Sequence, residues 1–140
     1  MISTEAALIY TMVIVSAADN VMTDSEMSAI GEIVRRLPVF EEYDANLLPD
    51  TARSCAEVLN TENGMETVLD LIKQSIPHAL RETAYALAIE VAAADGAASQ
   101  EELRLLELIR HRLEIDRLIA AGVERGARAV RAAIISRVVD

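Results

Sequence analysis

Residues 17–26 read Ala-Ala-Asp-Asn-Val-Met-Thr-Asp-Ser-Glu, and residues 93–102 read Ala-Ala-Asp-Gly-Ala-Ala-Ser-Gln-Glu-Glu. Each segment ends an apolar stretch with an Asp, turns, and opens a helix at a Thr or Ser that has a Glu three residues later. The apolar positions around them keep the same offset: Val15 and Val91, Ile30 and Leu106, Ile33 and Ile109, Leu37 and Leu113. This internal pseudo-repeat, with cores at about 7–37 and 83–113, indicates two halves that bring their acidic turns together.

The composition predicts one all-α domain. The chain has 140 residues, of which 52% are hydrophobic, yet it contains only one Phe, three Tyr and no Trp. This length suits a single domain over residues 1–140. Small side chains and few β-branched runs favour closely packed helices over sheets. We therefore expect a compact single-domain bundle of about seven helices.

Turn and capping residues divide the chain into these helices. Pro38 ends the second helix, and the acidic connector after it places Phe40 and Tyr43 as anchors against the core. Gly122 and Gly126 can divide the last helical region. The predicted helices cover about 4–18, 24–37, 49–59, 65–75, 77–94, 100–113 and the region from 117 onward.

Charge is distributed unevenly along the chain. The net charge is −10, and residues 1–80 account for most of it, whereas residues 117–137 hold five Arg against Glu124 alone. An acidic body without interleaved aromatic and basic residues argues against binding to nucleic acid. The basic C-terminal helix can be a solvated face, an internal complement to the acidic half, or a contact for an anionic membrane or a protein partner.

The cysteine content and the N-terminal segment indicate the cellular compartment of the protein. Cys55 is the single cysteine, which excludes an internal disulfide and a cysteine-based zinc site, and a reducing compartment is the natural interpretation. Residues 6–18 are mostly apolar, but only Glu5 is charged before them, and a membrane span needs about 20 residues. We expect a buried first helix in a cytoplasmic protein that can lie on the inner face of the membrane.

The two Glu residues of the repeated segments have two explanations. Thr23 with Glu26, and Ser99 with Glu102, each match a capping box, in which the hydroxyl and the carboxylate accept hydrogen bonds from amides of the first helical turn. Capping alone would account for both Glu residues. A role as cation ligands is the other interpretation, and the pattern leaves both open.

Asp19 and Asp95 need a further partner. Each follows the C-terminal end of an apolar helix, where the helix dipole disfavours an anion by about 0.3–1 kcal/mol. Hydrogen bonding within an Asx turn can offset this cost, and Asn20 and Gly96 are residue types that tolerate left-handed turns. The repetition of the Asp in both halves favours a bound cation instead.

The spacing and the ligand types narrow the choice of cation. An EF-hand loop that began at Asp19 or Asp95 would place an aliphatic residue where the bidentate Glu belongs, so a metal would bind between elements. Oxygen ligands favour Ca²⁺ or Mg²⁺, with Mn²⁺ also compatible. His78 and His111 lie outside the two acidic segments, and we expect neither to be a ligand.

The doubled segment resembles the signature of the TerB-like family, the tellurite-resistance TerB proteins and their relatives. The resemblance covers about residues 5–115, and Arg81 precedes the second copy. The second copy matches the family signature more closely than the first. It implies an all-α domain in which acidic residues of both repeats chelate a metal ion. Carried over by position, these are Asp19 and Glu26, then Asp95 and Glu102, with Asp24 supplementing the first pair. Relatives serve in tellurite-resistance and stress-response systems, often near membrane partners.

Two other classes of function are the alternatives to a metal-binding domain. Catalysis is disfavoured because the chain has few aromatic residues to form a substrate cleft, no Ser-His-Asp order and no phosphate loop, so no small-molecule substrate is indicated. A metal-independent module that binds a protein partner or a membrane surface, comparable to a co-chaperone scaffold, is the alternative. We expect a non-enzymatic metal-binding domain with a protein partner.

Overall fold

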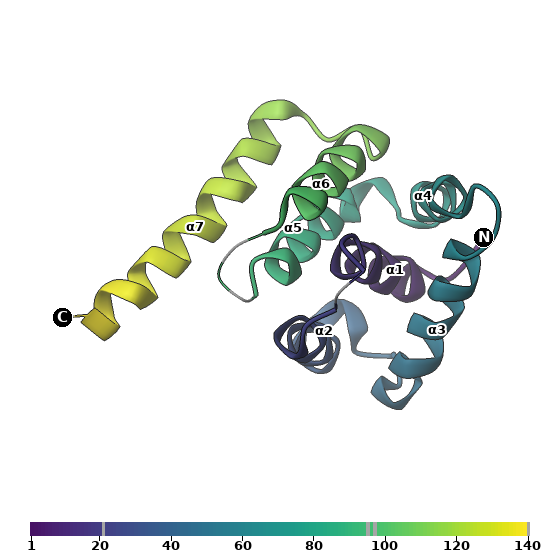
Figure 1. The fold of residues 1–140 in the computed structure, drawn as a ribbon, viewed down its shortest axis with the longest axis horizontal. Coiled ribbons are helices and arrows are strands. Elements are labelled where there is room, and N and C mark those ends of the chain that lie inside the picture. The colour runs from purple at the N-terminus through teal and green to yellow at the C-terminus, as the bar shows by residue number, and fades with distance from the viewer. Residues whose placement is uncertain (21, 95, 97, 140) are drawn as a thin grey trace.

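The structure is a computed structural model that describes residues 1–20, 22–94, 96 and 98–139, with side chains up to Val130. Within these ranges every regular element is helical, as predicted (Figure 1). The α-helices are α1 (Thr4–Ser16), α2 (Asp24–Arg36), α3 (Leu48–Leu59), α4 (Gly64–Ser75), α5 (Arg81–Ala92), α6 (Gln100–Arg112) and α7 (Arg117–Val139). Short 3-10 turns lie at Pro38–Phe40, Ala45–Leu47 and His78–Leu80.

Helix α1 forms the centre of the molecule. Every residue from Ala7 to Ser16 is buried, because the helix is apolar on all sides and packs against α3, α4 and α5 (Figure 1). Even the polar Thr11 is accommodated, since its hydroxyl donates to the carbonyl oxygen of Ala7 at 2.8 Å. The prediction that this segment is a buried first helix is confirmed. No helix of the described part of the chain is both long and apolar enough to cross a membrane.

The connector after α2 is anchored by two aromatic residues, as predicted. Phe40 is buried against the core, and its ring meets that of Tyr43 edge to face, with 6.1 Å between the centroids. The hydroxyls of Tyr43 and Thr51 share a hydrogen bond of 2.6 Å. The connector is therefore held onto the N-terminal end of α3.

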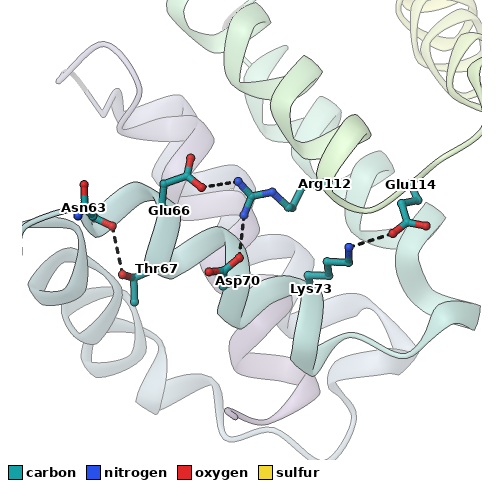
Figure 2. Close-up of polar contacts among 7 residues, drawn as sticks. All are labelled: Asn63, Glu66, Thr67, Asp70, Lys73, Arg112 and Glu114. Carbon is teal, nitrogen blue, oxygen red and sulfur yellow. Dashed lines mark hydrogen bonds and ion pairs between the residues drawn. The ribbon is translucent and has the colours of Figure 1, made fainter.

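Ion pairs tie α4 to the last residue of α6 and to Glu114, two residues beyond it (Figure 2). The guanidinium of Arg112 reaches both Glu66 and Asp70, which lie one turn apart on α4, and Lys73 pairs with Glu114 at 2.9 Å. Arg112 is the most sheltered of these groups, with 25% of its side chain exposed. The planar guanidinium, with donors on separate nitrogens, suits this double contact better than a single ammonium does.

Three boundary predictions need correction. Helix α7 continues without a break through Gly122 and Gly126, because residues that favour helices surround both glycines. Pro77 does not open α5; a 3-10 turn follows it, and α5 begins at Arg81. Helices α1 and α5 each end two residues earlier than predicted, before their acidic turns.

Candidate metal site at the acidic turns

The turns after α1 and α5 have equivalent backbone hydrogen bonds. The amide of Asn20 donates to the carbonyl oxygen of Ala17 at 3.0 Å, and the amide of Gly96 donates to that of Ala93 at 3.0 Å. Asn20 and Gly96 both have positive φ, 62° and 102°, so the chain passes through the left-handed region immediately after each Asp position. Asn and Gly are the residue types that adopt this conformation most readily, as the sequence indicated.

Both predicted capping boxes are present. Thr23 Oγ1 accepts from the amide of Glu26 at 3.1 Å, and Glu26 Oε1 accepts from the amide of Thr23 at 3.0 Å. In the second copy, Ser99 and Glu102 make the same reciprocal bonds at 3.1 and 2.8 Å. Each Glu thus uses one carboxylate oxygen to cap its helix.

Capping does not account for the burial of these carboxylates. Glu26 is 2% exposed and Glu102 is 3% exposed, whereas charged residues at helix N-termini are ordinarily solvated. The Oε2 atom of Glu102 is buried and has no hydrogen-bond partner within the described part of the chain. A buried charged oxygen without a partner is unfavourable, so ionisation of Glu102 is disfavoured at this position.

The two buried carboxyl groups lie next to each other. Burial, and then the adjacent carboxyl of Glu26, raise the pKa of Glu102 from 4.5 to about 7, although the hydrogen bonds with Ser99 act in the opposite direction. Like charges in one sheltered place disfavour ionisation. The two halves of the chain therefore meet through their capping glutamates.

The other predicted ligands have different environments. Asp19 is half-buried at the turn after α1, and Asp24 is exposed in the first turn of α2. Asp95 lies outside the described residues. Among the described residues, no group of three or more His, Cys, Asp and Glu side chains is arranged to hold a metal ion. The structure thus brings Glu26 and Glu102 together, and these two form the centre of the candidate site.

The chemistry of this pair suits a hard cation. Both side chains offer only oxygen donors, which Ca²⁺ and Mg²⁺ prefer. The C-terminal ends of α1 and α5 precede the two turns, and their dipoles and terminal carbonyl oxygens favour a positive charge. His78 and His111 are exposed. The residues present therefore fit an oxygen-coordinated divalent ion better than zinc.

A comparison with protein families agrees with the sequence resemblance. The model of the family described as "Tellurite resistance protein TerB" matches residues 5–121, which is most of the chain. The chain belongs to the TerB family. Neither a curated protein nor a solved structure matches it. In this TerB domain the match spans α1 to α6 and the first residues of α7, and so includes both acidic turns.

The burial of the two glutamates was missed by the sequence reasoning, although a signal for it was present. Glu26 lies four residues before Ile30, and Glu102 lies four residues before Leu106. Residues four apart share a helix face. Each Glu therefore belongs to the apolar stripe of its own helix, and this position predicts an inward-facing carboxylate in the first turn of α2 and of α6.

Proposed function

We propose that this TerB domain is a non-enzymatic cation-binding domain of a tellurite-resistance or stress-response system. Glu26 and Glu102 are the central ligands, Asp19 and Asp95 complete the coordination from the two turns, and Asp24 contributes from the rim. The ion is divalent and oxygen-coordinated, with Ca²⁺ or Mg²⁺ favoured. The observation that carries the proposal is the buried pair of adjacent carboxyl groups, one of which has an oxygen without a hydrogen-bond partner.

A cation would resolve the unfavourable features of this arrangement. It would neutralise the repulsion between the carboxylates of Glu26 and Glu102 and would coordinate the oxygen of Glu102 that lacks a partner. The capping oxygens can remain hydrogen-bonded to their amides, because each carboxylate has a second oxygen. The ion would then bridge the two halves of the domain where Glu26 and Glu102 meet.

Calorimetric titration of the metal-free protein with Ca²⁺, Mg²⁺, Mn²⁺ and Zn²⁺ tests the proposal. We expect one site per chain, and we expect Glu102→Gln or Glu26→Gln to weaken binding at least about tenfold, equivalent to 1.4 kcal/mol. Glu101→Gln is the matched control, because Glu101 is exposed in the same helical turn. This variant should bind the ion as tightly as the wild type does. Asp19→Asn and Asp95→Asn report the contribution of the turns.

Two outcomes would refute the metal site. One is the absence of both binding heat and a shift in melting temperature for every ion, which would favour the metal-independent interaction module. The other is equal weakening by Glu101→Gln and Glu102→Gln, which would point to diffuse attraction of cations to an acidic protein. Folding of each variant is checked by circular dichroism before titration.

A further inference from the structure

Ser16 has a fully buried hydroxyl group that no other described residue pairs with. The residue is 0% exposed, and its Oγ atom has no hydrogen-bond partner within the described part of the chain. The other buried Ser and Thr residues that the structure describes are paired: Thr11 donates to the carbonyl oxygen of Ala7, and Ser75 accepts from the amide of Ile2. A buried hydroxyl without a partner is unfavourable, so Ser16 costs the fold stability as it stands.

Ser16 lies at the end of the core that holds the two buried glutamates. It is the last residue of α1, and the turn with Asp19 leads from it to Asp24, where α2 begins. The first turn of α2, which contains Glu26, therefore follows closely on the C-terminal end of α1. In the second half of the repeat, Ala92 ends α5 and the turn after it leads to the first turn of α6.

Four helix ends converge at this place. Glu26 and Glu102 are adjacent, which brings the first turns of α2 and α6 together. Helix α1 contacts α2, α5 and α6, and α2 also contacts α5, so each half covers the central helix of the other. Of the three buried side-chain atoms without a partner among the described residues, two belong to this end of the core: Ser16 Oγ and Glu102 Oε2.

A hydroxyl oxygen is a suitable ligand for a hard divalent ion. Ser and Thr hydroxyls coordinate Mg²⁺ in phosphate-binding loops, for example. Because the hydroxyl is neutral, it adds an oxygen ligand without adding to the repulsion between two carboxylates. This suits a place where the described residues offer two adjacent carboxyl groups and no cluster of three acidic side chains.

We propose that Ser16 Oγ is a further ligand of the cation bound between Glu26 and Glu102. The inference rests on the proposed cation site, and it makes that site asymmetric, because α1 ends in a hydroxyl where α5 ends in Ala92. One ion would then be the partner of both oxygens that lack one. A serine that only fills space would be replaceable by Ala without any effect on the ion.

Titration of the metal-free full chain with Mg²⁺ and with Ca²⁺ tests the proposal. We expect Ser16→Ala to raise the Kd of the preferred ion about three- to tenfold. In chelator, the same variant should melt about 2–4 °C higher than the wild type, because the unpaired hydroxyl is gone.

Ser75→Ala is the matched control. Ser75 is also a buried serine that ends a helix, but its Oγ is paired with the amide of Ile2 at 3.1 Å. This variant should melt lower than the wild type in chelator and should bind the ion with the wild-type Kd. Ser16→Cys is a second probe, and it should weaken binding of Mg²⁺ or Ca²⁺ but tighten binding of Zn²⁺, since sulfur is a softer ligand.

Three results would overturn the proposal. A wild-type Kd in Ser16→Ala, with Zn²⁺ binding unchanged in Ser16→Cys, would remove Ser16 from the site and leave the glutamate pair in place. A lower melting temperature of Ser16→Ala in chelator would show that the hydroxyl has a partner without the ion. A wild-type chain that binds neither Mg²⁺ nor Ca²⁺ would overturn this inference together with the proposed function. Circular dichroism verifies the folding of each variant.

Discussion

Replacing Glu102 by Gln should make the metal-free protein more stable above neutral pH. Glu102 has a pKa of about 7 in the folded chain and 4.5 as its ordinary value, so the folded state holds an extra proton between these values. The free energy of unfolding therefore falls as the pH rises through this window, by about 1.4 kcal/mol per pH unit. Through Glu102 alone, the free energy of unfolding of the wild type thus falls by about 3 kcal/mol between about pH 4.5 and about pH 8.

Gln reproduces the protonated form of this side chain. Its carbonyl oxygen can accept from the amide of Ser99 as Oε1 does, and its amide can donate toward Glu26. The variant should therefore match the wild type at about pH 4 and exceed its unfolding free energy by up to about 3 kcal/mol at about pH 8. Urea unfolding in the presence of a chelator, at several pH values, measures the difference directly.

The difference between the two curves reports on Glu102 together with its neighbour Glu26, because the remaining titrating residues are common to both proteins and lie outside this pair. Glu101→Gln serves as the control and should follow the wild-type curve, since Glu101 is exposed. A wild-type-minus-variant difference that stays constant across the pH range would refute the reasoning. So would a Glu102→Gln protein that is less stable than the wild type at about pH 8.

Three further substitutions test the packing of the helices. Gly64→Ala should lower the free energy of unfolding by about 1–3 kcal/mol, because a Cβ there would meet the carbonyl oxygen of Leu59. Gly31→Ala should raise the free energy of unfolding by about 0.5–1 kcal/mol, since only the flexible side chain of Arg35 is near. Thermal melts measure both variants, and a shift of the melting temperature in the same direction for Gly31→Ala and Gly64→Ala would contradict this prediction. Arg112→Lys should cost about 1 kcal/mol by losing the double contact of Figure 2, whereas an equal loss at the exposed control Arg53→Lys would argue against it.

The sequence was sufficient for the local features of this fold because they depend on neighbouring residues. Thr23 and Ser99 cap their helices as predicted, and Asn20 and Gly96 take the left-handed conformation that their residue types favour. Phe40 occupies the core position expected of an aromatic residue in a polar connector. Each of these outcomes follows from interactions within a few residues.

Features that depend on contacts between distant helices were harder to predict. The argument from the helix dipole favoured Asp19 and Asp95 as the main ligands. In the structure, Glu26 and Glu102 are the buried acidic side chains among the described residues. The four-residue spacing to Ile30 and Leu106 indicated this burial, but the adjacency of the two carboxyl groups depends on how α1, α2, α5 and α6 pack. The burial of Ser16 has the same origin, since helices distant in the sequence pack against α1.

Burial of the two glutamates links stability to cation binding. Without an ion, Glu102 is held protonated or destabilises the fold, by up to about 3 kcal/mol at alkaline pH. An ion at 100 times its Kd adds about 2.7 kcal/mol, which is of similar size. Glu102→Gln should therefore reverse its effect with conditions: it stabilises the protein in chelator and forfeits the gain when the preferred ion is added. A purely structural carboxyl group would show the first effect without the second, so this reversal separates a cation site from a buried capping residue.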